Sequence, residues 1–565
     1  MPASPRFQIS PRIRHAAVLL ALSLVLGLAW YLLLYGRYPL YPSHVNWLYN
    51  ARGDVLQHQL GWEWFRQEPW RFPLGSIQAY GYPFGTSVAF MDAIPLLAIP
   101  FKLLSPWLEP NFQYYGFWEL ASLIGQVLFG LLILSEFTRS WAVKILGASL
   151  LAISAPMIFR AFYHSSLSAQ WLLLAGIWFA LLEYRGRLWR GAWILLFALA
   201  MLIHVYFIPM LAPLWLIGLF FHYKKEKRRW PLLLELLAAA AVVLGIGYSL
   251  GIFSLSYQSL QGSGFGFFSW NLDGFFNPFH FASAFVQGLG TGTDGQFEGF
   301  SYLGLGGFLI LPPAIYLFFE KEVSRRRLGF LWPFGLAALG LMLFALSNRA
   351  FLGNFPLWDL ELPDALLGFC NLFRTSGRFI LPVFYFIMVG GLAVLARNLR
   401  HPAPVLLAAV LLQLVDLRPL YTAKTPTGFT RYESGLLMEF WEPAAQTNAH
   451  IVIIPAKKLT SEYEPLAIFA AHNRLTLNLG YFARSDVQAF QSYAQETWAQ
   501  LKAGQADDRT IYVLSDPEWI AFAKSNLTRS LYFCELDEFA ILFSADNAVA
   551  QTDFNAPLYC SIPSR

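Results

Sequence analysis

The chain has 565 residues, of which 56% are hydrophobic and 13% are charged, and its mean hydropathy is +0.46. A soluble protein cannot bury that much apolar surface, so the composition indicates an α-helical polytopic membrane protein. The net charge of +5 is small for a polyanion-binding protein, and nucleic acid is therefore not an expected partner.

About eleven apolar segments have the composition of a membrane span, for which roughly 20 residues are needed. These predicted spans cover residues 16–35, 113–136, 142–158, 167–183, 190–205, 207–222, 231–253, 300–320, 328–347, 377–396 and 402–418. No small-residue cleavage site follows the first span, so we predict an uncleaved anchor.

Basic residues orient the spans, because Lys and Arg gather on the cytoplasmic side of a membrane. Arg6, Arg12 and Arg14 precede the first span and place the N-terminus in the cytoplasm. The other clusters fall on the same side: Arg139 and Lys144; Arg185, Arg187 and Arg190; residues 224–229; Lys321 with Arg325–Arg327; and Arg397 with Arg400. The opposite loop 254–299 contains no Lys or Arg.

Residues 86–104 are also apolar, but they contain Asp92, Pro95, Pro100 and Lys102. Counting this segment as a span would move every later basic cluster to the outside. We therefore predict a re-entrant or interfacial segment that packs on protein.

The composition changes after residue 418, where alternating apolar runs at 451–454, 511–514 and 540–543 predict strands. Helical stretches at 486–502 and 517–523 lie between them, so residues 419–565 are predicted to form a small α/β domain. An odd number of spans places this domain outside the cell membrane, in the periplasm of a Gram-negative cell. Cys534 and Cys560 would form a disulfide there, or remain two separate thiols.

The predicted organisation is thus a transmembrane domain over residues 1–418 and an extracytoplasmic domain over 419–565. The outer loops of the transmembrane domain are residues 36–112, 159–166, 254–299 and 348–376.

The first outer loop carries the strongest candidate for chemistry, in the string from Gly53 to Trp62. On a helix Asp54 and His58 lie on one face, with Gly61 on the next turn leaving room for a ligand. Asp54 is either a helix N-cap or a general base, and Gln57 and His58 are candidate substrate-binding residues.

Asp92 requires a partner or water, because it lies within an apolar segment. It either caps a half-helix that begins near Ala93 or joins Asp54 in base and electrostatic work.

The second outer loop contains Arg160, His164 and Gln170. Arg160 is interpreted as an interfacial anchor, and His164 as a residue that orients a ligand or binds a metal.

The glycine- and phenylalanine-rich loop 254–299 is predicted to be mobile. Its acids Asp273, Asp294 and Glu298 either bind a divalent ion or are solvated, and solvation is favoured.

Arg374 and Arg378 are four residues apart, so on a helix they share a face that suits phosphate oxygens. We favour an anionic lipid head group as their ligand over a role as snorkelling anchors.

This layout resembles the GT-C class of membrane glycosyltransferases. Asp54 matches their first-loop catalytic acid, and the segment from Tyr82-Pro83-Phe84-Gly85 to Phe101-Lys102-Leu103 is similar to their Pro-rich segment. The residues Gly53-Asp54, Gln57-His58 and Gly61-Trp62, with Phe90-Met91-Asp92 and the 374–378 string, resemble more closely an uncharacterised family of bacterial multi-pass proteins.

One departure narrows the implied mechanism. Oligosaccharyltransferases carry an Asp-x-Asp motif in the second loop, where this chain has His164-Ser165-Ser166. The metal-independent members are therefore the better comparison, and neither a metal nor another cofactor is expected.

The resemblance implies an inverting glycosyltransferase of the bacterial inner membrane that uses a polyprenyl-phosphate-linked sugar. Asp54 would act on an extracytoplasmic glycan, lipid or protein acceptor, and Arg374 and Arg378 would hold the departing phosphate. Asp92, His58, His164 and Gln170 would shape the pocket among membrane lipids. The alternatives are a non-enzymatic transporter, a lipid-handling protein or a scaffold of envelope polysaccharide assembly.

Overall fold

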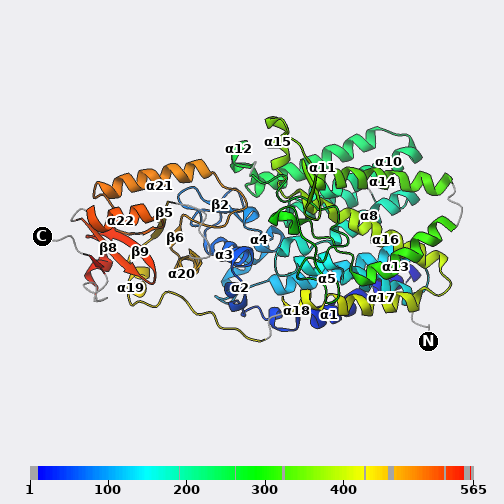
Figure 1. The fold of residues 1–565 in the computed structure, drawn as a ribbon, viewed down its shortest axis with the longest axis horizontal. Helices are drawn as coiled ribbons and strands as arrows, with labels where there is room; N and C mark the ends of the chain where they lie inside the picture. The colour runs from blue at the N-terminus through cyan, green and yellow to red at the C-terminus, as the bar shows by residue number, and fades with distance from the viewer. Residues whose placement is uncertain are drawn as a thin grey trace, which may run out of the picture. The chain divides into compact units, whose positions relative to one another are not determined.

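The computed structural model describes residues 10–189, 191–260, 263–320, 325–424, 428–455, 463–526, 530–552 and 560–561. Three residues of the predicted basic clusters, Arg6, Arg190 and Lys321, lie outside them. The chain forms two compact units (Figure 1). Unit 1 comprises residues 1–42, 114–244 and 261–428, and unit 2 comprises residues 43–113, 245–260 and 429–565.

Each of the eleven predicted spans coincides with a helix, and the chain is a multi-pass α-helical membrane protein. These helices are α1 (Pro11–Tyr35), α5 (Tyr115–Ser135), α6 (Trp141–Ala152), α8 (Trp171–Arg185), α9 (Gly191–Ile203), α10 (Phe207–Glu226), α11 (Trp230–Ser249), α13 (Gly304–Glu320), α14 (Arg325–Leu346), α16 (Leu381–Asn398) and α17 (Pro402–Asp416). Within the described residues, seven are long and apolar enough to cross a membrane, and α6, α9, α13 and α17 are apolar but shorter.

Small residues let the helices of unit 1 approach closely. A Cβ atom on Gly130 of α5 would lie 3.0 Å from the Cα of Ala148 in α6. A Cβ atom on Gly176 of α8 would lie 3.0 Å from a methyl carbon of Leu214 in α10. Since lipid is as apolar as the helices themselves, this close packing is a main source of their association.

Short elements lie between or beside the spans of unit 1. They are α7 (Ala155–Arg160), η4 (Ser165–Ser168), η6 (Asp294–Gly299), strands β3 (Arg349–Leu352) and β4 (Phe355–Asp359), α15 (Asp364–Asn371), η7 (Ser376–Ile380) and α18 (Arg418–Thr422).

The loop that was predicted to be mobile is largely packed in its described part. The backbone N–H of the buried Trp270 donates to the Ala345 carbonyl, and its indole N–H donates to Ser301. Asp416, at the end of α17, accepts hydrogen bonds from Ser283, from the Tyr302 hydroxyl and from the Leu305 N–H. The expectation of mobility is therefore wrong for these parts of the loop, because buried hydrogen bonds hold them.

Unit 2 contains a six-stranded mixed sheet in the order β10-β8-β9-β7-β5-β6 (Figure 1). Its strands are β5 (His450–Ile454), β6 (Thr476–Leu477), β7 (Thr510–Leu514), β8 (Leu531–Leu536), β9 (Phe539–Ser544) and β10 (Cys560–Ser561). Strand β5 runs parallel to β6 and β7, and the other pairs are antiparallel. The three predicted strands are confirmed. A disulfide joins Cys534 of β8 to Cys560 directly opposite in β10, which excludes two separate thiols.

Helices cover both faces of this sheet. The two predicted helices, α21 (Val487–Lys502) and α22 (Pro517–Asn526), pack on one face, where Trp498 stacks on Trp519 at 4.8 Å between ring centroids. Asp486 accepts a hydrogen bond from the Ala489 N–H and so caps α21. On the other face, Phe440 at the start of α19 (Trp441–Thr447) contacts Phe543.

The first outer loop belongs to the same unit as this sheet. It contains α2 (Asn46–Asn50), α3 (Gly53–Gln67), β1 (Ser76–Ile77), β2 (Thr86–Ser87) and α4 (Pro95–Leu104). Tyr80 forms a parallel bridge with Leu477 at the β6 edge, where the Leu477 N–H donates to the Ala79 carbonyl at 2.8 Å. α20 (Glu464–His472) packs along α3. The loop is thus part of a folded body with the sheet.

Candidate functional site

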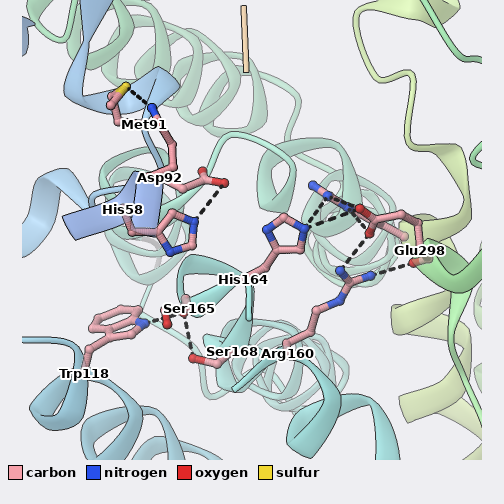
Figure 2. A network of polar contacts seen from close by, with 11 residues as sticks. His58, Met91, Asp92, Trp118, Arg160, His164, Ser165, Ser168 and Glu298 are labelled. Atoms are coloured by element: carbon pink, nitrogen blue, oxygen red, sulfur yellow. Dashed lines mark hydrogen bonds and ion pairs between the residues drawn. The ribbon is translucent and has the colours of Figure 1, made fainter. Parts of the chain in front are cut away.

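A buried cluster of charges in unit 1 is centred on Glu298 of η6 (Figure 2). The Arg160 guanidinium donates to Glu298 Oε2 at 2.7 Å and to the Glu298 backbone carbonyl at 2.6 Å. The Arg378 guanidinium donates from Nε to Oε2 at 3.0 Å and from Nη2 to Oε1 at 2.8 Å. Both carboxylate oxygens are therefore bonded by cations, which makes Glu298 unsuitable as a metal ligand and excludes the predicted solvated state.

The local backbone explains how two arginines reach one acid. Gly377 packs against Gly299, since a Cβ atom on Gly377 would lie 2.9 Å from the Gly299 Cα atom. Any side chain at Gly377 would therefore separate η7, which carries Arg378, from η6, which carries Glu298. The guanidinium of Arg160 lies over the Phe159 ring, and that of Arg378 lies over the Tyr206 ring, each at 5.0 Å from the centroid. These ring faces favour the cationic state.

The cluster carries more positive than negative charge. Two guanidinium groups and one carboxylate leave a net charge of +1 before any histidine is counted. Although burial alone would raise the pKa of Glu298, the charges of Arg378 and Arg160 hold this pKa well below its usual range. A buried excess of positive charge favours the binding of an anion at the cluster.

His164 adjoins the cluster. Its Nε2 atom lies 3.4 Å from Glu298 Oε1 and 3.5 Å from Arg378 Nη2 (Figure 2). Its predicted role, to orient a ligand or bind a metal, stays a prediction.

Lys424 supplies a further cation. Its ammonium lies 5.4 Å from the centroid of Phe159, the ring that also faces Arg160, and 5.0 Å from the centroid of Tyr163. Burial lowers the pKa of Lys424 to about 7, and the charge of Glu119 opposes this decrease. Its charge state consequently changes near physiological pH.

Arg374 and Gln170 do not join these contacts to Glu298. Arg374 lies before η7, half-buried, and donates to the Ser263 carbonyl at 3.5 Å. The prediction that Arg374 and Arg378 share a helix face is wrong, because the helical segment begins only at Ser376. Gln170 is buried and donates to the Pro156 carbonyl while accepting from the Tyr385 hydroxyl, so it ties helices together.

In unit 2, α3 carries Asp54 and His58 one turn apart, as predicted. Asp54 is half-buried in the first turn, but the N-cap position is occupied by Arg52, so the N-cap role predicted for Asp54 is wrong. Gly61 packs directly against Met91, since a Cβ atom on Gly61 would lie 2.5 Å from the Met91 Cβ. The space at Gly61 is thus filled by the protein and not left for a ligand.

Asp92 lies near His58, with 3.9 Å between its Oδ2 atom and His58 Nε2 (Figure 2). The backbone of Asp92 has φ +51°, and that of Ile94 has φ +52°. A left-handed conformation is unfavourable for both residues, above all for the β-branched Ile94. α4 begins at Pro95 without a side-chain cap, so the prediction that Asp92 caps a half-helix is wrong.

Gln57 is a buried connector between segments of unit 2. Its amide nitrogen donates to Met91 Sδ, and its amide oxygen accepts from the Tyr80 hydroxyl at 3.0 Å and the Tyr481 N–H at 3.3 Å. A substrate could bond this amide only by displacing these partners, which favours a structural role over the predicted binding role.

The contacts among Glu298, Arg160 and Arg378, and the place of Lys424 near them, were not predicted from the sequence. A signal was available, because Arg160, Lys424 and Arg378 all lie near the predicted outer ends of spans. Glu298 precedes a predicted span in the same way. Opposite charges near the same end of a helical bundle have few partners except one another, so they are expected to pair.

Comparison with known proteins places the chain in context. The family model described as Domain of unknown function (DUF6311) matches residues 24–418, and the model of the DUF6311 C-terminal domain matches residues 440–544. The expected resemblance to an uncharacterised multi-pass family is thereby confirmed. None of the proteins of curated function matches the chain.

The chain is similar to several solved structures at low sequence identity. Arabinofuranosyltransferase AftD from Mycobacteria is 14% identical, with a TM-score of 0.45, over 92% of this chain and 35% of that one. A mutant of AftD gives 13% identity and a TM-score of 0.46, over 89% and 36%. ArnT from Cupriavidus metallidurans in the apo state gives 13% identity and a TM-score of 0.40, over 86% and 92%. This chain spans about a third of the AftD length.

Proposed function

We propose that this chain, which belongs to the family described as Domain of unknown function (DUF6311), is a membrane glycosyltransferase that takes its sugar from a polyprenyl-phosphate donor. The observation that carries the proposal is the buried excess of positive charge around Glu298, formed by Arg160 and Arg378 with Lys424 nearby. Transfer from such a donor leaves negative charge on the departing phosphate. Fixed cations stabilise that charge as it develops.

In this proposal Glu298 organises the arginines and does not react. Its carboxylate holds both guanidinium groups in fixed orientations, so little reorganisation is needed when the phosphate departs. His164 would bond the donor from the edge of the cluster. Arg374, which precedes η7, would extend the positive region toward the lipid phosphate.

The acceptor would be activated from the first outer loop. Asp54 is half-buried in the first turn of α3. As the GT-C resemblance implies, it would take the proton of an acceptor hydroxyl while the sugar is displaced in line from the phosphate. Asp92 and His58 would support that step electrostatically.

We further propose that the protein lies in the bacterial inner membrane, with its N-terminus in the cytoplasm and residues 419–565 outside. The one-sided distribution of Lys and Arg supports this orientation. The disulfide between Cys534 and Cys560 adds support, because disulfides persist in oxidising compartments.

The test uses the full chain in lipid nanodiscs with undecaprenyl phosphate as a binding probe and radiolabelled polyprenyl-phosphate sugars as donors. Arg378→Gln is expected to weaken probe binding at least tenfold, because a bidentate charged contact is lost. Arg397→Gln, at the exposed opposite end of the same helical stretch, is the matched control and should bind normally.

Asp54→Asn is expected to bind the probe as the native chain does and to lose about a hundredfold or more in transfer. Equal transfer by Asp54→Asn and the native chain would remove Asp54 from the mechanism. Binding of the probe by the native chain without transfer from any donor would favour the lipid-handling or scaffold alternative.

A further inference from the structure

The residue at the N-cap position of α3 forms no side-chain cap. The first N–H groups of a helix have no partner within the helix, and a side-chain acceptor at the N-cap position usually bonds one of them. That position is held by Arg52, whose guanidinium cannot accept a hydrogen bond, and no side-chain cap is formed there. An acceptor from elsewhere in the fold can therefore take this place at the first turn, which contains Asp54.

Glu464 of the C-terminal region provides that acceptor. Its Oε1 atom accepts a hydrogen bond from the Gly53 N–H at 2.8 Å. Glu464 is buried, and burial raises the pKa of its carboxyl group while the Gly53 N–H opposes the rise. A carboxylate in this place also interacts favourably with the positive end of the α3 dipole.

The same region of the chain bonds α3 along its length. The Tyr481 N–H donates to Gln57, the Trp64 indole donates to the Leu475 carbonyl at 3.2 Å, and the Gln67 amide donates to the Ala471 carbonyl at 3.1 Å. With Glu464 at the first turn, these contacts reach from the start of α3 to its end. The C-terminal region is consequently a support for α3.

We propose that Glu464 is a positioning residue that fixes the first turn of α3 and thereby the carboxylate of Asp54. This inference rests on the proposed function for the role of Asp54, but its structural part stands apart from it. A general base must lie within about 3 Å of the proton that it takes, and a frayed first turn would not hold Asp54 at that distance. The position of Asp54 in the first loop thus depends on the cap that Glu464 of the C-terminal region provides.

The experiment measures amide hydrogen exchange by mass spectrometry on the full chain in nanodiscs. Glu464→Ala is expected to speed exchange in peptides covering residues 53–57 about fivefold, the size of a lost helix cap. Glu464→Gln keeps a carbonyl acceptor and should restore protection. Glu496→Ala, which removes an exposed carboxylate from α21, is the matched control and should change nothing.

Native exchange at residues 53–57 in Glu464→Ala would overturn the proposal, whether or not the protein transfers sugar. Fast exchange there with slow exchange across residues 487–502 would support it and exclude unfolding of the region. If both peptides exchange fast in Glu464→Ala, the Gln variant decides: restored protection supports capping, and fast exchange overturns it. Transfer assays then report separately on the proposed function, since the native chain must be active for Glu464→Ala to lower its rate.

Discussion

The acids of the two units stand in contrasting environments. In unit 1, Glu298 is buried and both of its carboxylate oxygens are bonded by arginines. In unit 2, Asp54 and Asp92 are only half-buried. Asp54 lies in the first turn of α3, whose N-cap residue forms no side-chain cap, and the backbone of Asp92 has φ +51°. A carboxylate held by two guanidinium groups cannot change its protonation state in the physiological range. A carboxylate that is not fully buried is accessible to a substrate, as a general base must be.

Under the proposed function, this contrast separates an acid that builds the site from acids that take part in the reaction. Glu298 orients two cations, and its removal would leave them buried without a counter-charge. Asp54 and Asp92 are the acids to which the proposed function gives a part in the reaction, and a charged residue near an apolar segment is a candidate for such a part.

The largest effect is expected from Glu298→Ala. Breaking a buried ion pair from one side costs about 3–5 kcal/mol, because the partner charges lose their compensation. Thermal denaturation in detergent, followed by tryptophan fluorescence, should show a clearly lowered midpoint. The control Asp294→Ala removes an exposed acid from the same η6 segment and should leave the midpoint unchanged. Equal thermal midpoints for Glu298→Ala and Asp294→Ala would show that Glu298 does not stabilise unit 1 more than an exposed acid does.

A smaller effect should arise from Lys424. Its pKa is lowered by burial from 10.5 in the unfolded chain to about 7 in the folded chain. Between pH 7 and 10.5 the unfolded chain binds more protons, so the contribution of Lys424 to stability rises with pH across this window. The slope is at most about 1.4 kcal/mol per pH unit, which corresponds to one proton.

Denaturation of the native chain and of Lys424→Met at pH 6, 7.5 and 9 measures this contribution by difference, because other titrating groups cancel. The native chain should gain stability relative to the variant as pH rises through 7. An unchanged difference across the three pH values would show that the ammonium is not penalised by burial.

The smallest effects on stability are expected from Asp54→Asn and Asp92→Asn. Each change keeps the side-chain shape, and asparagine tolerates the left-handed backbone at residue 92. Unfolding free energies should stay within about 0.5 kcal/mol of the native chain. A loss as large as that of Glu298→Ala would show that these acids are structural, and it would remove the distinction between the two units.

Much of the fold could be predicted from the sequence because it depends on periodicity and composition. The eleven apolar segments became helices at the predicted places, and the three predicted strands of residues 451–543 are present. These signals are local. The placement of the first outer loop with the sheet was not predictable in this way, because it depends on contacts such as that of Trp64 with Leu475, 411 residues apart.

The same distinction between local signals and long-range contacts applies to the candidate site. Asp54 and His58 share a helix face, as their spacing predicted. Arg374 and Arg378 do not, because the helical segment starts between them, at Ser376. Glu298 was predicted to be solvated. Its two arginine partners lie 138 residues before it and 80 residues after it, so the sequence around Glu298 gives no sign of them. Pairing over such distances is a property of the fold and not of the local string.

The backbone bridge between Tyr80 and Leu477 has a consequence for how the protein is made. The first loop leaves the ribosome long before the segment that contains Leu477. The backbone groups of the loop that bond this segment therefore have no partner there during most of synthesis. Contacts between distant parts of a chain also form slowly. Maturation of the loop that carries Asp54 is therefore a late, post-insertion event, and a chain cut before residue 429 would insert its helices yet leave that loop unfinished.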